Sequence, residues 1–268
     1  MGCGPGQTLI VAGSGSLVPS GIGPYRPTVP VWVFDRSGEA IRHLVDVPGI
    51  ERYYDGRSIR PRQLGKSIVF GASCDRLLLG LGDAFELYSW GRSDESPDTI
   101  RWPGDARAVT QAMLERVIEN ALRSARTREQ RKNWERELRE LEIPHTLPAY
   151  QALLVGPGGY VWLKNSEVVE GDAEHRSILD IDRSKVLGSV VFPRGFDLLE
   201  LTESWAVGRW IDSLGLHYVD LYEIAARDAI PNGASMIPSV KRTQARTSGS
   251  SSELLSFRQR FSAMSRSL

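Results

Sequence analysis

Cysteine is almost absent from this sequence. Its 268 residues include only Cys3 and Cys74, which lie far apart and form no CxxC pair. A disulfide framework and a zinc-finger-like site are therefore excluded, while the redox compartment stays undetermined.

Neither sign of charge predominates, and no long apolar run occurs. Lys plus Arg and Asp plus Glu each number 33. The chain has no net positive charge that would attract nucleic acid, and no basic patch with interleaved aromatic residues appears. We therefore expect no nucleic-acid binding. No apolar run approaches the length of a transmembrane helix, and residues 1–6 lack the basic flank and apolar core of a signal peptide. We expect a chain without a transmembrane segment.

Sequence motifs for catalysis and for phosphate binding are missing too. The chain has no GxSxG elbow, no GxxxxGK[ST] loop and no HExxH pair. Its four histidines, His43, His145, His175 and His217, lie in separate segments without the spacing of metal ligands. We expect no catalytic, cofactor-binding or metal-binding residues.

One glycine-containing loop raises the possibility of a dinucleotide site. Gly13-Ser-Gly15 follows the predicted strand 8–12, and Asp35 ends a second apolar strand about 20 residues later. That site needs a helix N-terminus to hold the pyrophosphate, and the prolines between residues 19 and 30 exclude a helix there. A plain loop is the better interpretation.

What the chain does contain is a series of short β-rich runs separated by turn residues. Residues 149–224 hold two consecutive groups, with Trp162 and Trp205 in the second run of each, 43 residues apart. A similar strand–turn–strand segment around Phe85 keeps a 39-residue spacing to Trp162 once the stretch 105–142 is left out. This period predicts β-propeller blades, although a β-sandwich is the alternative.

Two hairpins share a turn sequence. Residues 31–45 and 178–193 both turn at Asp-Arg-Ser. Pro48 follows the first segment, and Pro193 ends the second. We interpret them as third and fourth strands of two blades. The arginine-rich segment 49–65 after the first hairpin is predicted to be a long loop, either functional or solvated filler.

A change of period predicts a helical insertion at 105–142. Apolar residues recur at helical spacing, with Thr110 as N-cap of a first helix and Thr127 in a capping box before a second. A helical hairpin fits best, and a single long helix is the alternative. We expect docking on the sheets through the apolar side chains of Met113, Val117, Trp134 and Leu138.

Strand patterns end near residue 224. Residues 228–268 are rich in serine and arginine and predict a disordered tail, with a possible short helix at 253–264. The predicted domains are therefore a β-propeller domain at 1–227 and this tail.

Several of these motifs resemble a known family. The segments Pro48-Gly-Ile-Glu-Arg-Tyr53, Asp75-Arg-Leu-Leu-Leu-Gly-Leu-Gly-Asp83 and Trp205-Ala-Val-Gly-Arg-Trp-Ile-Asp212 resemble bacterial six-bladed β-propeller proteins of the NHL-like class. The resemblance covers roughly residues 8–226, in turn and core positions. It implies six blades, often on an exported or lipid-anchored cell-envelope protein; this sequence alone leaves the localisation unknown.

The chain accounts for about four blades, a partial propeller. We therefore expect a fragment of a longer protein or a ring completed by self-association through open blade faces. The residues expected near those faces are Leu9, Val11, Leu199 and Leu201.

The predicted function is a non-catalytic propeller scaffold that binds a protein or small-molecule partner. The alternative is a metal-dependent, lactonase-like propeller hydrolase with an ion held by carboxylates from different blades. Its candidate ligands are Asp83, Glu86, Asp212 and Asp220, although carboxylates in turns are common for conformational reasons.

Overall fold

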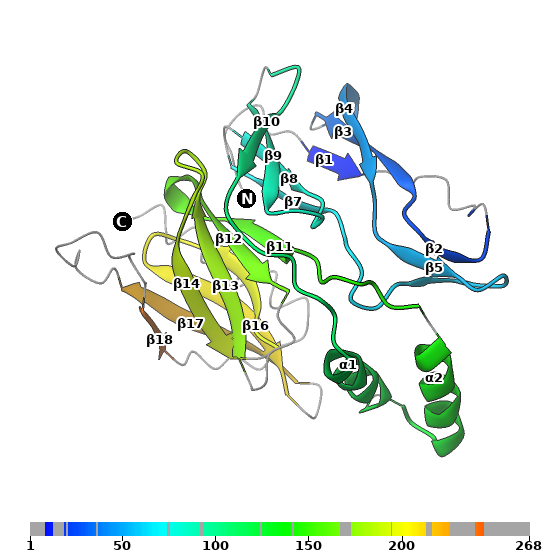
Figure 1. Ribbon diagram of the computed structural model, residues 1–268. Helices are drawn as coiled ribbons and strands as arrows, with labels where there is room; N and C mark the ends of the chain where they lie inside the picture. Colours follow the sequence, from blue (N-terminus) through cyan, green and yellow to red (C-terminus); the bar gives the residue numbers. More distant parts are fainter. Residues whose placement is uncertain are drawn as a thin grey trace. The chain divides into compact units, whose positions relative to one another are not determined.

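The computed structural model is mainly β, with several small antiparallel sheets and two helices (Figure 1). It describes residues 9–12, 19, 21–35, 37–73, 76–91, 94–123, 125–140, 142–166, 173–193, 195–212, 216–225 and 239–243. The chain divides into two compact units: the first holds β1 to β10 and both helices, and the second holds β15 to β18. The sheet β11–β14 supplies residues to both units.

Two sheets form the core of the first unit. One has the order β1-β3-β4 and the other the order β10-β9-β8-β7. Their strands are β1 Leu9–Ala12, β3 Thr28–Phe34, β4 Ala40–Pro48, β7 Val69–Ala72, β8 Arg76–Gly80, β9 Glu86–Gly91 and β10 Asp98–Arg101. Val31 from the first sheet packs with Leu79 and Trp90 from the second, and all three are almost fully buried. Val29 and Val31 on β3, and Leu77 and Leu79 on β8, lie at alternate positions, so one face of each sheet points into this core.

A third, smaller sheet in this unit corrects the loop predicted at 49–65. β2 Gly23–Tyr25, β5 Arg52–Tyr54 and β6 Ile59–Pro61 pair in the order β2-β5-β6. The sequence does not predict these strands, because three residues that include prolines and arginines are too few to show an alternation of apolar and polar side chains.

The helical insertion is confirmed as two helices, α1 Gln111–Arg123 and α2 Arg128–Glu140. Thr110 Oγ1 accepts a hydrogen bond from Met113 N at 3.3 Å, and Thr127 Oγ1 accepts one from Gln130 N at 3.1 Å. Gln130 Oε1 in turn accepts from Arg126 N at 2.9 Å. Both predicted caps are therefore present, and the second explains why a new helix starts without a Gly or Pro.

The remaining sheets follow the chain strand by strand. Both have simple up-and-down order, β11-β12-β13-β14 and β15-β16-β17-β18. The strands are β11 Tyr150–Val155, β12 Tyr160–Asn165, β13 Ala173–Asp180, β14 Lys185–Pro193, β15 Asp197–Leu201, β16 Trp205–Ile211, β17 His217–Ala225 and β18 Ser239–Thr243. A short 3-10 turn, η1 Pro157–Gly159, joins β11 to β12.

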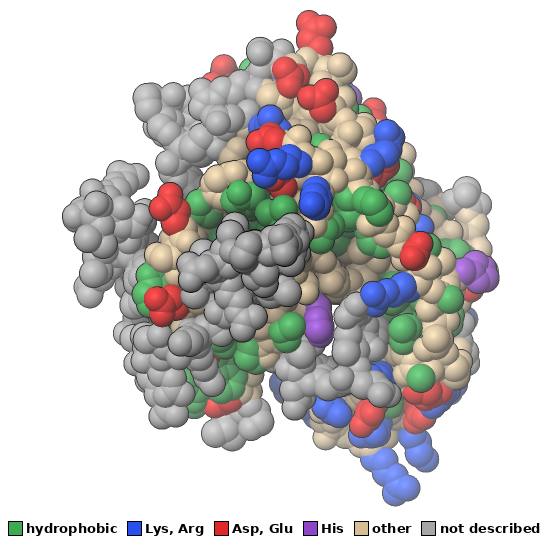
Figure 2. All heavy atoms as spheres, turned by 60° about the vertical axis from the view of Figure 1, so that its left-hand side comes forward, with side chains coloured by type: hydrophobic (Ala, Val, Ile, Leu, Met, Phe, Trp, Pro, Cys, Tyr) green, Lys and Arg blue, Asp and Glu red, His purple; other side chains and the backbone are tan. Residues whose placement is uncertain are grey.

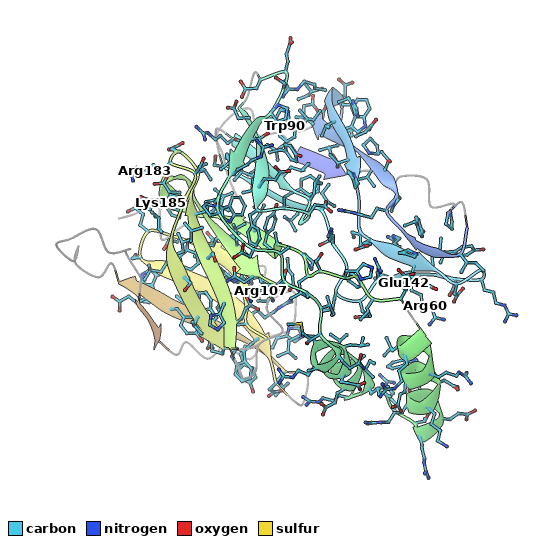
Figure 3. All side chains as sticks on the ribbon, viewed as in Figure 1. Arg60, Trp90, Arg107, Glu142, Arg183 and Lys185 are labelled. Carbon is cyan, nitrogen blue, oxygen red and sulfur yellow. The ribbon has the colours of Figure 1, made fainter. Side chains whose placement is uncertain are left out.

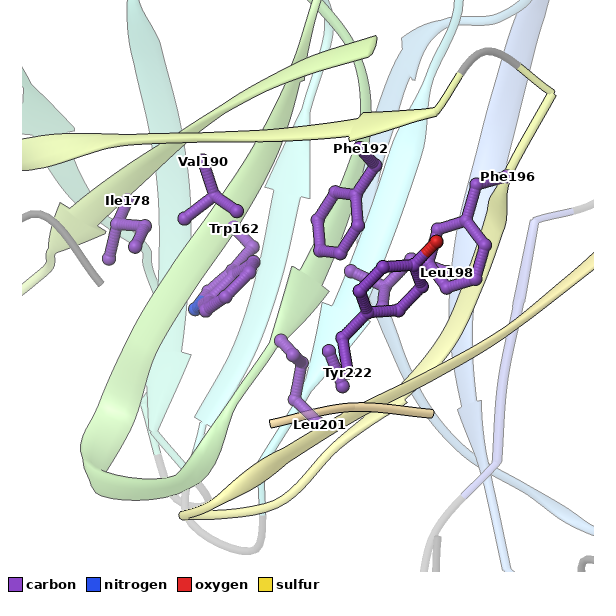
Figure 4. Close-up of a cluster of buried hydrophobic side chains, with 9 residues drawn as sticks. Trp162, Ile178, Val190, Phe192, Phe196, Leu198, Leu201 and Tyr222 are labelled. Carbon is purple, nitrogen blue, oxygen red and sulfur yellow. The ribbon is translucent and has the colours of Figure 1, made fainter. Parts of the chain in front are cut away.

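An aromatic cluster forms the core of the second unit (Figure 4). Phe192 and Phe196 stack with ring centroids 5.0 Å apart, and Tyr222 meets both edge-on at 5.5 and 5.0 Å. Gly208 lies under this cluster, where a Cβ atom would overlap the Phe196 ring. Strands β14, β15 and β17 are therefore held together by ring geometry as well as by apolar burial.

The predicted equivalence of Phe85, Trp162 and Trp205 is wrong. Phe85 precedes β9, which is the third strand of its sheet in chain order, because β7 adds a strand before β8. Trp162 is the third residue of the second strand of its sheet, and Trp205 is the first residue of such a strand. The hairpins β3–β4 and β13–β14 are confirmed. No closed ring of blades is described.

Two further expectations are corrected. Strands do not cease near residue 224, since β18 pairs with β17 inside the predicted tail. Leu201 is buried in the aromatic cluster, whereas Leu199 is exposed. The side chains of Leu9 and Val11, both cysteines, Gly13–Gly15, the rest of the tail and its predicted helix lie outside the described residues. No helix among those described is long and apolar enough to cross a membrane.

Candidate interaction surface

The helical hairpin, defined as α1, α2 and their connection, is closed at its base by the chain segments that lead to and from it. Ala108 and Thr146 form an antiparallel bridge. Val109 N donates to His145 O at 2.9 Å, and Leu147 N donates to Arg107 O at 2.8 Å. Figure 3 shows Arg107 and Glu142 on these two segments, above α1 and α2. The hairpin therefore leaves the sheets at a fixed position.

A buried arginine ties the exit of the hairpin to the small sheet. Arg62 Nε donates to Glu142 O at 2.9 Å, and its guanidinium also pairs with Glu51 Oε1 at 2.5 Å. The side chains of Arg62 and Glu51 are 8% and 13% exposed, whereas that of Glu142 is 58% exposed. Glu51 Oε2 also accepts from Lys66 N at 2.9 Å. The guanidinium geometry thus joins the end of β6 to the segment after α2.

The two helices contact each other. Arg139 on α2 donates to Glu115 on α1 at 2.7 and 3.0 Å, and it also pairs with Glu135 at 3.3 Å. The hydrogen bond from Arg139 is the main cause that holds the pKa of Glu115 below its usual value. A bidentate bridge of this kind fixes how the helices cross.

The docking of the hairpin on the sheets through four apolar side chains stays a prediction. Met113, Val117, Trp134 and Leu138 are only partly buried. The buried positions are Ile118 and Leu122, at 2% and 4% exposure. Sequence periodicity found the apolar stripe but could not say which part of it is covered.

Exposed charges dominate the outer face of α2. Arg128, Arg131, Lys132 and Arg136 are all exposed. Toward the lower end of Figure 2, at the height where Figure 1 places the helices, Lys and Arg side chains extend from the surface with Asp and Glu side chains between them. This face therefore offers charged contacts of both signs rather than an apolar groove.

The β5–β6 turn beside the hairpin base is preorganised by one carboxylate. Asp55 Oδ1 accepts from Ser58 N at 2.6 Å and from Arg57 N at 2.8 Å. These bonds, first from Ser58 and then from Arg57, lower the pKa of Asp55 to about 2. The carboxylate stabilises the turn, and both of its oxygens accept hydrogen bonds from turn residues.

Carboxylates of the hydrolase alternative have structural partners. Asp83 pairs with Arg26 at 2.6 Å and with Lys66 at 3.1 Å, and Arg26 Nε donates to Gly49 O. Glu86 pairs with Arg101 at 3.0 Å. Asp83 and Arg26 thus connect the end of β4 to the turn between β8 and β9.

The other two carboxylates belong to the second unit. Asp212 accepts from Leu216 N and from Tyr218 Oη, both at 2.9 Å, and Asp220 is buried on β17. Among the residues that the structure describes, no three His, Cys, Asp or Glu side chains form a group that could hold a metal ion. His43 contacts Asp46 at 2.9 Å on β4, while His145, His175 and His217 lie in the hairpin base, β13 and β17.

The sequence therefore predicted the helical hairpin but not the contacts that hold its base. Sequence periodicity located the helices and their caps. It missed the contacts made by Arg62 and Arg26, because pairs separated by 80 and 57 positions leave no local pattern. No protein-family model matches the chain, and no curated protein matches it.

Proposed function

We propose that this chain is a non-catalytic binding scaffold in which β-propeller blades carry the helical hairpin to a partner protein. Three consecutive four-stranded antiparallel sheets with up-and-down order support the propeller architecture. Face-to-face packing within each unit, through Val31 with Leu79 and through Phe192 with Tyr222, is also what neighbouring blades require. Under this proposal the sheets supply rigidity and the hairpin supplies recognition.

The observation that carries the proposal is the contrast between the fixed base of the hairpin and the exposed charges on α2. The base is fixed by backbone bonds at 107–109 and 145–147 and by Arg62, whereas α2 carries exposed basic side chains. An element that is positioned firmly at its base and presents charged side chains has the properties of a binding surface.

The metal-dependent hydrolase is less well supported. Asp83 already balances Arg26 and Lys66, and Asp212 already accepts two hydrogen bonds. A divalent ion would have to displace these partners. Thermal unfolding with and without Mg²⁺, Mn²⁺, Ca²⁺ and Zn²⁺ tests this alternative: a metal-dependent rise in Tm that is lost in Asp83→Asn would favour the hydrolase.

Site-specific photocrosslinking tests the binding scaffold directly. A photoreactive residue replaces Asn133 on α2 and, in a matched variant, replaces Arg183 in the exposed β13–β14 turn. In extract from source cells, we expect a discrete protein adduct from position 133 and none from position 183. The absence of an adduct at 133, or equal adducts at both positions, would refute the proposal.

A further inference from the structure

A row of three basic side chains runs along α2. Arg128, Lys132 and Arg136 occupy every fourth position, so successive members are about 6 Å apart along the helix axis. All three are exposed. Within the part of the chain that the structure describes, Arg128 and Lys132 form no ion pair, and Arg136 has only a 3.5 Å contact with Asn133.

The hairpin neutralises two other arginines but leaves this row without an ion pair. Arg139 binds Glu115 and Glu135, and Arg123 pairs with Glu119 at 3.4 Å. Within the row, each fourth neighbour is itself basic, and like charges at that spacing destabilise an isolated helix. Carboxylates nevertheless stand close to the row in the sequence: Glu129 and Glu135 lie three positions from Lys132, and Glu140 lies four positions after Arg136.

Two of these carboxylates flank the row. By helical geometry, Glu135 lies beside one edge of the row and Glu129 beside the other. A nucleic-acid backbone, which is negative along its whole width, would meet both flanking carboxylates. A narrow acidic ridge would meet only the row, so the flanks select against polyanions that are broader than one helix face.

We propose that this row binds an acidic helix of the partner protein, one whose Asp or Glu residues recur at every fourth position. The 6 Å spacing of such carboxylates matches the spacing of the row, and side-by-side helices present such positions to each other. This inference rests on the proposed binding function and specifies the chemistry of the partner.

The test uses the full chain and a defined probe. The probe is a fluorescein-labelled helical peptide with Glu at four successive fourth positions, compared with a peptide of the same composition whose Glu residues are scattered around the helix. The row variant carries Arg128→Glu, Lys132→Glu and Arg136→Glu. Its matched control carries Arg57→Glu, Arg183→Glu and Lys185→Glu, three exposed positions outside the helices with the same change in net charge.

At low ionic strength we expect the row variant to bind the Glu-row peptide at least tenfold more weakly than the unaltered chain, and the control to remain within about twofold. The row variant should instead bind a peptide with Lys in place of each Glu. No binding of the Glu-row peptide, equal binding of the scattered peptide, or tighter binding of an 18-base-pair DNA duplex would each overturn the inference.

The photocrosslinking experiment separates the two proposals. If the adduct from a photoreactive group on α2 persists when the row is reversed, the binding scaffold stands and the acidic-helix inference fails. If no adduct forms even with the unaltered row, the binding scaffold itself fails.

Discussion

Replacing Arg62 by methionine should destabilise the first unit by about 3–5 kcal/mol, because it leaves the largely buried Glu51 carboxylate without its cation. The Arg62 and Glu51 side chains are 8% and 13% exposed, so solvent cannot replace the lost pair. Of the hydrogen bonds described for the Glu51 carboxylate, the one from Lys66 N–H would remain. The contact with Glu142 adds little, since that side chain is 58% exposed, and Glu142→Gln should cost less than about 1 kcal/mol.

Urea unfolding followed by tryptophan fluorescence measures these changes. Combining Arg62→Met with Glu51→Gln should recover part of the loss, with a coupling free energy of about 1–3 kcal/mol. Hydrogen exchange should also accelerate at Val109 and Leu147 N–H groups, because the base of the hairpin loses a neighbouring restraint. A cost below about 1 kcal/mol for Arg62→Met, or strict additivity in the cycle, would contradict the anchoring role.

Three further predictions concern single positions. Gly208→Ala should cost about 1–3 kcal/mol, because the new Cβ meets the Phe196 ring, whereas Gly21→Ala, with open space around it, should be nearly neutral in the same urea assay. Tyr150→Phe should cost about 1 kcal/mol by removing the bond to Glu86 O, and ultraviolet titration of Tyr150 should show a pKa raised by burial; a midpoint near 10 would contradict this. The Asp55 carboxyl should titrate near pH 2 by NMR, so its contribution to stability is complete above its ordinary value of 3.8 and is lost as the pH falls toward 2. A midpoint near 3.8 would mean that the Ser58 and Arg57 bonds do not form in solution.

Elements with a clear period were predictable from the sequence. The helices carry a stripe at helical spacing and two threonine caps, and both caps form in the structure. The strands of β13–β14 and β15–β17 have apolar runs bounded by turn residues, and they form where they were expected. Local signals of this kind act over a few residues and so survive without knowledge of the tertiary structure.

The errors have a different physical origin, namely pairing over long sequence distances. β7 contains a glycine and has only four residues, so the sequence pattern does not predict it as a strand. The strands around Phe85 are therefore numbered one too low in the predicted blade. β18 lies in a polar segment and forms only by pairing with β17 across residues 226–238. At the open end of the β5–β6 hairpin, Arg62 pairs with Glu51 through both its backbone N–H and its guanidinium. In each case backbone or ionic partners outweigh weak local preference.

The way the hairpin joins the sheets explains how its composition can be so charged. The bridge between Ala108 and Thr146, with its two flanking backbone bonds, closes the insertion at its base. Once that closure forms, β10 and β11 are joined by a short hydrogen-bonded connection, whatever lies between Val109 and His145. Strand pairing therefore does not depend on which side chains α2 carries on its exposed face. If the proposed binding function is right, the exposed basic row on α2 is the part of the hairpin that meets the partner.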